Sequence, residues 1–259
     1  MRKKISIITI NLNNRQGLKN TIDSVINQTY NNFEWIIIDG GSIDGSKEII
    51  KKYSRYFNYW VSEPDKGLYN AMNKGILASS GEYLLFLNSG DTLHERITLQ
   101  KAISYIKDAD FYVGDMERGY ILEHPDIDSC EDLCTLLITK NLPHQSTFIK
   151  KENFIKFGLY REDKKIVSDW IFFFSSIILN NATLKKLPFI VSNFEKPGIS
   201  NNWKLANKER LEYFEEYPRL KTVWDFYAKY YNINKKISNN KLFRMVGRIY
   251  INFFSKKFK

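Results

Sequence analysis

A short polar turn follows one of the apolar segments of this chain, and its residue types suit a divalent cation. The turn is Asn88-Ser89-Gly90-Asp91, directly after the apolar run Tyr83–Leu87. Mg²⁺ usually takes only one or two protein carboxylates and completes its coordination with water and phosphate oxygens, so Asp91 alone is enough beside a diphosphate. The same four residues also fit a type I turn without any ligand, since Asn, Gly and Asp are common there.

A second polar segment, residues 39–46, contains three glycines in eight residues. Glycine lets the backbone approach a ligand closely and adopt positive φ. Asp39 follows an apolar run and could accept a hydrogen bond from a nucleobase imide. Asp44 better fits a capping role for a helix predicted at Ser46–Tyr53.

A third polar segment lies between residues 62 and 75. Asp65 is predicted to cap a helix at Leu68–Ala78, on which Asn70, Asn73 and Lys74 share one face because they are three and four positions apart. A lysine there could meet a diphosphate as a point charge. The alternative is plain solvent exposure of the polar face.

The elements that must position these residues alternate along the first half of the chain. The expected strands are Ile5–Ile10, Phe33–Ile38, Tyr59–Val61 and Tyr83–Leu87, and the expected helices are Gly17–Asn27, Ser46–Tyr53 and Leu68–Ala78. This alternation predicts an α/β fold with a mostly parallel sheet flanked by helices on both faces. Ligands of such sheets bind beyond the carboxyl ends of the strands, which is where the polar segments fall.

The second half of the chain is less regular. Strands are expected at Asp110–Val113, Tyr120–Leu122 and Lys186–Phe194, a strand turning into a helix within Phe148–Phe157, and an apolar helix at Trp170–Leu179. From about residue 201 the pattern is helical and rich in aromatic and basic residues.

Composition and charge exclude several classes of protein. The chain has 259 residues, of which 43% are hydrophobic, so it can bury a large core and is not disordered. Its net charge is +10, but residues 226–259 carry nine Lys or Arg and no acid, leaving +1 for the rest. A basic nucleic-acid-binding main domain is therefore not expected.

The remaining features of the sequence concern location. Cys130 and Cys134 form neither a disulfide framework nor a zinc site, which favours a reducing cytosolic compartment. No segment has the ~18 uninterrupted apolar residues that span a bilayer. The first ten residues, MRKKISIITI, read as a first strand rather than a signal peptide.

Taken together in order, the motifs resemble a known family. The segments SIITINLNNRQGLKNTIDSVINQTYNNFEWIIIDGGSIDGS and SEPDKGLYNAMNKGILASSGEYLLFLNSGD are similar to the opening half of the family-2 glycosyltransferases, which are inverting sugar transferases of GT-A fold. The resemblance is strong to about residue 92, moderate to about residue 179, and absent in the tail. It implies a nucleotide-diphosphate sugar, most simply a UDP-sugar, as the donor.

The resemblance also implies site residues. Thr9 and Asp39 would contact the base, Asn11 and Arg15 would lie beside it, and Asp91 would be the Mg²⁺- or Mn²⁺-binding acid of the family's Asp-x-Asp motif. Asn88 and Gly90 stand where acids are frequent in the family, so a thinner metal site is expected. The full set expected to bind the nucleotide sugar is Thr9, Asn11, Asn13, Arg15, Asp39, Gly41, Asp65, Lys66, Asn70, Asn73, Lys74, Asn88 and Ser89.

An inverting transferase needs a base for the acceptor hydroxyl. Asp169, in VSDWIFFF, matches the family's acid near the start of a helix, although the helix dipole alone would also favour a carboxylate there. Glu162 and Asp163 are its rivals. His144 and Gln145 resemble a His-Gln pair in one branch of the family, for which an acceptor role and a purely structural role are both open.

The C-terminal part supplies two further expectations. The loop of residues 196–202, including Ser200, resembles a lid over the phosphates. A helix over residues 241–257 would have one broad apolar face and basic residues opposite, so it could pack on its own domain or lie on an anionic membrane.

These inferences define one expected organisation. Residues 1–200 form a GT-A domain, with 1–92 binding the nucleotide sugar and 93–200 the acceptor, and residues 201–259 form a helical basic C-terminal extension. The expected function is sugar transfer to a glycan or lipid-linked acceptor in bacterial surface-polysaccharide synthesis, at the cytoplasmic face of the cell membrane. The alternatives are a sugar-nucleotide nucleotidyltransferase, a non-catalytic membrane adaptor, and nucleic-acid binding by the tail.

Overall fold

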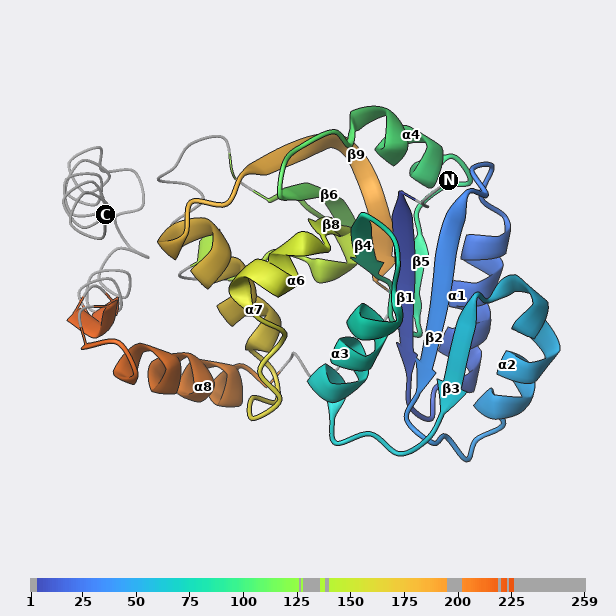
Figure 1. Cartoon of the computed structure of the whole chain (residues 1–259), viewed down its shortest axis with the longest axis horizontal. Helices are drawn as coiled ribbons and strands as arrows, with labels where there is room; N and C mark the ends of the chain where they lie inside the picture. The colour runs from blue at the N-terminus through green and yellow to red at the C-terminus, as the bar shows by residue number, and fades with distance from the viewer. Residues whose placement is uncertain are drawn as a thin grey trace. The chain divides into compact units, whose positions relative to one another are not determined.

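The structure is a computed structural model that describes residues 4–125, 127, 136–137, 140–194, 202–218, 220–222 and 224–225 (Figure 1). The chain divides into two units, one of Met1–Pro125 with Leu142–Asn201 and the other of Asp126–Asn141 with Asn202–Lys259. The expectations for Cys130, Cys134, Ser200 and the tail after residue 225 lie outside the described residues.

Four parallel strands form the first half of the sheet, in the order β3-β2-β1-β4. Their bounds are β1 (Ile5–Asn11), β2 (Phe33–Asp39), β3 (Tyr59–Ser62) and β4 (Tyr83–Phe86). The apolar, largely β-branched runs predicted to be strands are therefore strands, and burial on both sides explains their continuous hydrophobicity. Asn11 is level with Asp39, and Asp39 with Ser62, so the carboxyl ends of these strands lie at one edge.

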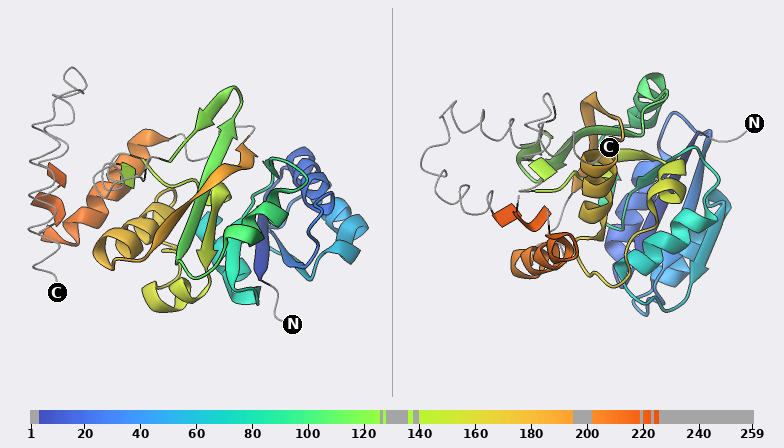
Figure 2. Two further views of the ribbon diagram at one scale, coloured as in Figure 1. Left: turned by 90° about the horizontal axis from the view of Figure 1, so that it is seen from above. Right: turned by 60° about the vertical axis from the view of Figure 1, so that its left-hand side comes forward.

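Helices cover both faces of the parallel strands, as Figures 1 and 2 show. Helices α1 (Arg15–Ile26) and α2 (Ser46–Tyr53) bury Leu18 and Ile50 in the same core cluster as Ile7 of β1. Ile8, one residue on, points to the other face and meets α3 (Leu68–Ala78). A Cβ added to Gly75 of α3 would lie 2.4 Å from Cγ2 of Ile8, so a glycine is needed for this close approach.

The second half of the sheet mixes strand directions. β8 lies antiparallel between β4 and β6, β6 is parallel to β9, and β5 is antiparallel to β9. The strands are β5 (Asp91–Leu93), β6 (Phe111–Arg118), β7 (Ile121–Glu123), β8 (Thr147–Lys150) and β9 (Leu184–Phe194), and the helices are α4 (Thr98–Tyr105), α6 (Glu152–Phe157) and α7 (Ser168–Phe173). The predicted α/β class, with a parallel first half of the sheet flanked by helices, is confirmed.

Three local predictions need correction. The apolar helix expected at Trp170–Leu179 begins at Ser168 as α7 and continues as a π-helical segment, Phe174–Leu179. β5 was not expected, because its first residue, Asp91, was assigned to the polar turn. Asp65 does not cap α3, whose N-cap is Gly67, because its carboxylate pairs with Lys74 instead.

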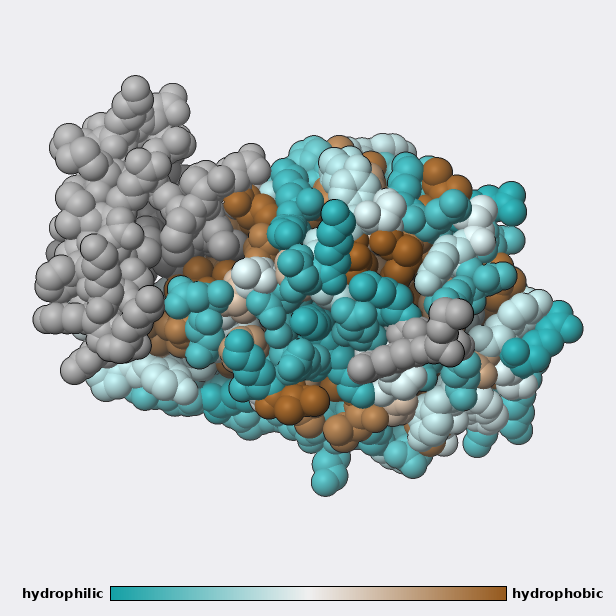
Figure 3. Space-filling model, turned by 45° about the horizontal axis from the view of Figure 1, so that its top comes forward, coloured by the Kyte–Doolittle hydropathy of each residue, from teal (hydrophilic) through white to brown (hydrophobic). Residues whose placement is uncertain are grey.

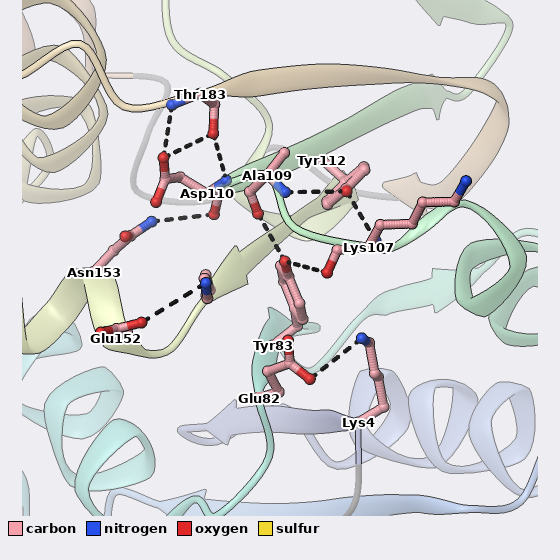
Figure 4. A network of polar contacts seen from close by, with 11 residues as sticks. Lys4, Glu82, Tyr83, Lys107, Ala109, Asp110, Tyr112, Glu152, Asn153 and Thr183 are labelled. Carbon is pink, nitrogen blue, oxygen red and sulfur yellow. Dashed lines mark hydrogen bonds and ion pairs between the residues drawn. The ribbon is translucent and has the colours of Figure 1, made fainter.

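Side-chain bonds join the strands at the edge opposite the polar segments (Figure 4). The hydroxyl of Tyr83, at the start of β4, donates to the carbonyl of Ala109 at 2.7 Å, and the hydroxyl of Tyr112 accepts from the N–H of Lys107 at 2.8 Å. Asp110 accepts from both the N–H and the hydroxyl of Thr183 at 2.8 Å. These bonds fix the amino ends of β4, β6 and β9, at the edge away from the polar segments.

On the face drawn in Figure 3, hydrophilic side chains predominate and apolar ones appear in scattered groups. In the second unit, α8 (Trp203–Glu215) is capped by Asn202, whose side chain accepts from the N–H of Leu205, and the rings of Phe214 and Trp224 stack with centroids 4.8 Å apart. None of the described helices has the length and apolar character required to cross a bilayer.

Candidate active site

A row of hydrogen-bonded polar residues closes the carboxyl edge of β1, β2 and β3. Asp39, which is completely buried, accepts from Nδ2 of Asn11 at 2.7 Å and from the hydroxyl of Ser62 at 2.7 Å. It also accepts from the hydroxyl and the N–H of Ser42, at 2.6 and 3.1 Å. The carboxylate therefore holds three strand ends and the glycine loop together.

The residues expected to bind a nucleobase differ in which of their hydrogen-bonding atoms already have partners in the chain. Thr9 is fully buried, and its hydroxyl accepts from Nε1 of Trp35 at 3.1 Å. Asn11 is also buried, but no described residue donates to its Oδ1. Asp39 thus receives four donors, whereas Oδ1 of Asn11 is a buried acceptor with no partner among the described residues.

The loops after β1 and β2 are built on each other. Asn13 has a left-handed backbone, with φ of 49°, and its Oδ1 accepts from the N–H of Ile43 at 2.9 Å. Gly41 has φ of +80° and lies against Pro64, a conformation that favours glycine. These contacts shape one continuous loop surface beside the strand-end row.

Asp44 links the first turns of two helices. Its Oδ1 accepts from the N–H of Ser46 at 3.0 Å, and its Oδ2 accepts from the N–H of Arg15 at 2.7 Å. The formal N-cap of α2 is Gly45, so Asp44 serves the helix from one residue further out. The side chain of Arg15 lies against Gly45, at the same edge of the sheet.

The polar face of α3 is largely occupied by other parts of the chain. Asn73, which is buried, donates to the carbonyl of Tyr160 at 2.8 Å and to Glu162 at 3.0 Å, and accepts from the N–H of Tyr160 at 3.0 Å. Asn70 donates to the second oxygen of Glu162 at 3.0 Å. The structure thus gives Asn73 a role in holding the segment around Glu162, and this carboxylate, a predicted rival base, is bound to α3.

The two lysines near α3, Lys66 and Lys74, differ in their ion pairs. Lys74 forms ion pairs with Asp65 at 2.6 Å and Glu63 at 2.8 Å, and these hydrogen bonds, that of Asp65 first, raise its pKa. Lys66 is exposed, and in the described part of the chain no acid lies within ion-pair distance of it. The charge of Lys74 is therefore offset by two acids, whereas that of Lys66 is not offset by an ion pair within the described residues.

Hydrogen bonds from Thr21 of α1 and from its N-cap residue, Asn14, hold the Asn88–Asp91 turn. The N–H of Asp91 donates to the carbonyl of Asn88 at 2.9 Å, and Gly90 has φ of +106°, which is the signature of a type II turn and not of the expected type I. The hydroxyl of Thr21 donates to the carbonyl of Asp91 at 2.7 Å, and Asn14 donates to the carbonyl of Ser89 at 2.8 Å.

The carboxylate of Asp91 is buried in this turn. Its Oδ2 accepts from the N–H of Asn88 at 3.1 Å, while no described donor reaches its Oδ1. Burial raises the pKa of Asp91 to about 7, against the opposing effects of the His144 charge and the Asn88 N–H. Burial therefore outweighs the positive charges of His144 and Arg118 in setting the pKa of this acid.

Behind the turn, four side chains form one hydrogen-bonded line. Nδ2 of Asn88 lies 3.2 Å from Nε2 of His144, and Nδ1 of His144 lies 3.0 Å from Oδ2 of Asp169. The hydroxyl of Tyr69 on α3 lies 2.8 Å from Oδ1 of Asp169. This line brings the predicted base, the predicted His-Gln pair and the predicted metal turn into one place, with Gln145 buried beside His144.

The electrostatics of the line favour a charged carboxylate against an imidazole. Burial raises the pKa of Asp169, but the hydrogen bond and charge of His144 and the bond from Tyr69 outweigh it, so the pKa lies below its usual value. Burial lowers the pKa of His144, but Asp169 outweighs this and the pKa is raised. The third candidate acid, Asp163, is half exposed and pairs with Arg161 at 2.7 Å.

Some residues of the site were not among those expected from the sequence. In the sequence, Tyr69 fits the apolar stripe of α3 and Thr21 lies within α1. No neighbouring residue indicates that either side chain forms hydrogen bonds in the site. Asp115, in the run YVGDMERG, accepts at its carbonyl from Ser146 at 3.2 Å and pairs with His124 at 2.8 Å. Asp115 lies just beyond the strand predicted at Asp110–Val113, and its carboxylate there was the available signal.

The residues fit a hard divalent cation shared with a ligand. Asp91 offers a carboxylate oxygen with no described partner, in a burial that disfavours its charge. Among the described residues, no three His, Cys, Asp or Glu side chains gather closely enough to hold a metal ion by themselves. Coordination would therefore have to include oxygens from a phosphate-bearing ligand, as Mg²⁺ commonly does.

Known sequences with the same pattern are sugar transferases. The family described as Glycosyl transferase family 2 matches residues 6–133. The "PGL/p-HBAD biosynthesis glycosyltransferase" of Mycobacterium bovis is 29% identical over 216 residues, which cover 80% of this chain and 82% of that protein. A glycosyltransferase of Mycobacterium tuberculosis, named as uncharacterized, is 30% identical over 205 residues, covering 76% and 77%.

Solved structures share the fold at low sequence identity. S. aureus TarS in complex with UDP-GlcNAc matches with a TM-score of 0.64 and 18% identity, over 75% of this chain and 59% of that one. The mannosyltransferase PcManGT from Pyrobaculum calidifontis, in complex with GDP-Man and Mn²⁺, matches with a TM-score of 0.57 and 16% identity, over 78% and 59%. The chain thus spans about three fifths of the length of these structures, and the likeness concerns the fold.

Proposed function

The chain belongs to the family-2 glycosyltransferases, and we propose that it moves a sugar from a UDP-sugar to a hydroxyl of a glycan or lipid-linked acceptor, with inversion at the anomeric carbon. The TarS and PcManGT structures hold UDP-GlcNAc and GDP-Man, which supports a nucleotide-diphosphate donor on this fold. Oδ1 of Asn11, a buried acceptor with no partner among the described residues, could receive the imide N–H of uracil.

One observation carries the proposal: the strand-end row and the Asn88–Asp91 turn lie on neighbouring strands at the same edge. β1, which ends at Asn11, pairs with β2 on one side and with β4 on the other, and all three run parallel. A nucleoside at Asn11 and a diphosphate at Asp91 would therefore occupy adjacent positions along the carboxyl edge. This is the position in which open α/β sheets bind their ligands.

Asp91 would hold Mg²⁺ or Mn²⁺ together with the diphosphate. When bound, the cation would stabilise the negative charge of the leaving nucleoside diphosphate. Lys66 would add a second positive charge near the amino end of α3, where anions are also favoured. Asn88 and Ser89, in the same turn, would lie near the sugar end of the donor.

The line of Asn88, His144 and Asp169 supplies the basic group that an inverting transfer needs. The acceptor hydroxyl must lose a proton as its oxygen attacks the anomeric carbon, and the diphosphate leaves from the opposite side. His144 and Asp169 lie next to the turn that would hold the diphosphate, within one side chain of it. The pair therefore sits at the correct end of the donor to serve the acceptor.

A panel of nucleotide sugars tests the proposal. UDP-GlcNAc, UDP-glucose, UDP-galactose and GDP-mannose are each added with Mn²⁺, and both the unfolding temperature and the slow release of nucleoside diphosphate are measured. A bound donor at 100 times its Kd should stabilise the fold by about 2.7 kcal/mol. The Asp91→Asn variant should lose the Mn²⁺-dependent part of the effect and the release.

The matched control is Asp108→Asn, which removes an exposed carboxylate at the opposite edge of the sheet. It should behave as the wild type. Stabilisation without any release would favour a non-catalytic adaptor that kept the fold, and pyrophosphate formation from UTP and a sugar phosphate would favour a nucleotidyltransferase. A complete lack of stabilisation by every donor, with and without Mn²⁺, contradicts the proposed function.

A further inference from the structure

We propose that Tyr69 is a positioning residue for sugar transfer, and that its buried hydroxyl holds the carboxylate of Asp169, the base of the reaction, in both of its protonation states. The inference rests on the proposed function, because it concerns how the base of that reaction is held. The family resemblance gives a role to the acid at the start of α7 and none to the tyrosine in the first turn of α3.

Tyr69 contacts the base across a long separation in sequence. Its hydroxyl lies 2.8 Å from Oδ1 of Asp169, which is 100 residues later in the chain, and 2.6 Å from the carbonyl oxygen of Ile166. Both residues of the pair are buried, with 3% of Tyr69 and 5% of Asp169 exposed. The hydroxyl therefore joins α3 to the start of α7 in surroundings that largely exclude water.

The segment that leads to Asp169 is held by α3 at two points. Asn73 lies four residues after Tyr69 on the same face of the helix, and it bonds to both the N–H and the carbonyl of Tyr160. The rings of Tyr69 and Tyr160 also pack together, with centroids 5.6 Å apart. Because Lys66, which would meet the diphosphate, directly precedes α3, this helix connects the proposed donor site to the base.

The hydroxyl of Tyr69 has one proton and two acceptors within hydrogen-bond distance. The carbonyl of Ile166 can only accept, so the proton lies toward that carbonyl or toward Asp169. While Asp169 is ionised, donation to the carboxylate is favoured because hydrogen bonds to charged groups are stronger. Once Asp169 is protonated, its O–H can donate to the Tyr69 oxygen while Tyr69 donates to Ile166. Each protonation state of the base thus has its own hydrogen-bond arrangement.

The surroundings keep the tyrosine neutral and the aspartate ionised. Burial, followed by the charge of Asp169, raises the pKa of Tyr69 well above its usual value. Burial also raises the pKa of Asp169, but the hydrogen bond and charge of His144 and the hydrogen bond of Tyr69 lower it more. Tyr160 also faces this pair, and the charge of Asp169 adds to burial in raising the pKa of Tyr160. Tyr69 therefore acts as a hydrogen-bond donor to the base and not as a second base.

The proton has a defined place at each stage of the transfer. The O–H bond of the acceptor breaks and its proton bonds to the carboxylate of Asp169, while the acceptor oxygen bonds to the anomeric carbon. The bond from that carbon to the diphosphate oxygen breaks, and its electron pair leaves with the nucleoside diphosphate. The hydroxyl proton of Tyr69 turns to the carbonyl of Ile166, and Asp169 returns its own proton to water after the products leave.

Two tyrosine variants test the role of the hydroxyl. The assay is release of nucleoside diphosphate from the donor of the panel that the wild type cleaves fastest, with water as the acceptor. Tyr69→Phe should lower kcat about tenfold, the equivalent of one hydrogen bond to a charged group, and change the KM for the donor less than about twofold. A Tyr69→Phe variant that loses less than about threefold in kcat overturns the proposal.

The matched control is Tyr160→Phe, which removes the hydroxyl from the adjoining ring. That hydroxyl is buried and has no partner among the described residues, so the control tests loss of a buried tyrosine oxygen that does not hold the base. Tyr160→Phe should keep at least half of the wild-type kcat. Equal losses in the two variants would mean that the tyrosine pair acts through packing, which contradicts the proposal.

Two further readouts distinguish positioning of the base from a general loss of structure. Because the hydrogen bond from Tyr69 lowers the pKa of Asp169, the acid limb of the kcat profile should move to higher pH in Tyr69→Phe. In an Asp169→Asn background, Tyr69→Phe should change the residual rate less than about twofold, because the carboxylate on which Tyr69 acts is gone. An unmoved acid limb, or an equal effect in both backgrounds, contradicts the proposal.

A titration without turnover separates the inference from the proposed function. In protein labelled with ¹³C at aspartate, the carboxyl signal of Asp169 is assigned by its loss in Asp169→Asn. The pKa of Asp169 should be higher in Tyr69→Phe than in the wild type and unchanged in Tyr160→Phe. Equal values in the wild type and Tyr69→Phe overturn the inference, even in a chain that transfers sugar. A raised value in a chain that cleaves no donor supports the Tyr69 contact and counts against the proposed function.

Discussion

Asn11 and Asp39 end adjacent parallel strands, and Nδ2 of Asn11 donates to Oδ1 of Asp39 at 2.7 Å. The bond makes the carboxylate part of the architecture of the edge, because the same carboxyl group also receives Ser42 and Ser62. A residue that the family resemblance assigns to nucleobase contact therefore also shapes the pocket. Substitution of Asp39 should therefore lower the free energy of unfolding even without a ligand.

The first prediction concerns Asp39→Asn. The amide would have one acceptor oxygen for four donors, and its NH₂ group would face two of them. Loss of hydrogen bonds to a buried carboxylate costs about 1.5–3 kcal/mol each, so we expect a destabilisation of about 3 kcal/mol. Urea unfolding without ligand measures it. The exposed Asp108→Asn should change the free energy by less than about 0.5 kcal/mol, and an equal, small effect of both would show that Asp39 is not a structural centre.

The second prediction concerns Asp91 and pH. Burial raises the pKa of Asp91 to about 7 in the folded chain, whereas an unfolded chain titrates it near 3.9. Between these values the folded state holds a proton that the unfolded state lacks, so the Asp91 contribution to stability is complete below about pH 4 and is lost as pH rises through 7.

Comparison with Asp91→Asn isolates that contribution. Relative to the variant, the wild type should lose up to roughly 4 kcal/mol between pH 4 and pH 8, measured by urea unfolding in the presence of a chelator. Added Mn²⁺ and UDP should recover part of the loss for the wild type alone. If the difference in unfolding free energy between the two proteins does not change with pH, burial does not raise the pKa of the Asp91 carboxyl.

The third prediction separates two asparagines of α3. Asn73 makes three hydrogen bonds to Tyr160 and Glu162 in a buried position, whereas Asn70 makes its bond to Glu162 at the surface. Asn73→Ala leaves the backbone N–H and carbonyl of Tyr160 without these partners, which should cost about 2–3 kcal/mol. Asn70→Ala should cost less than about 1 kcal/mol. If Asn73→Ala instead lowered donor affinity at unchanged stability, Asn73 would be a ligand-binding residue, as the sequence suggested.

The fourth prediction concerns the basic tail, which lies outside the described residues. It follows from the sequence, in which residues 226–259 carry nine of the basic residues and no acid. Deletion of residues 236–259 should abolish binding to vesicles with 30% anionic lipid and leave weak binding to neutral ones unchanged, since each basic residue near such a surface contributes about 1 kcal/mol. Unchanged vesicle binding would refute the membrane role. Retention of DNA by the tail would favour nucleic acid instead.

The parallel half of the fold could be predicted because its signals are local. Ile5–Ile10 and Phe33–Ile38 are unbroken apolar runs, and each is followed at once by polar residues, so both the strands and their functional ends are visible in the sequence. β5 was not predicted because its first residue, Asp91, was assigned to the polar turn after β4. The π-helical turn after Phe173 escaped because its apolar residues would suit an α-helix equally well.

Within the site, pairings distant in sequence set the limit. Asp65 was expected to cap α3, but Lys74, nine residues on, takes its carboxylate. Asn73 bonds to Tyr160 across 87 residues, and His144 to Asp169 across 25. Residue types at strand ends indicated which side chains belong to the site. They could not indicate which would be consumed in holding it together, because that depends on loops that meet only in the folded chain.

The central claim is that the carboxyl edge of β1, β2 and β4 binds a nucleotide diphosphate, with a cation at Asp91. A crystal structure of the wild type with UDP and Mn²⁺, with anomalous data for manganese, tests it most directly. The account predicts one anomalous peak within coordination distance of the Asp91 carboxylate, with the diphosphate on the same ion and the uracil beside Asn11. UDP bound elsewhere, or manganese bound away from Asp91 with UDP at this edge, would contradict it.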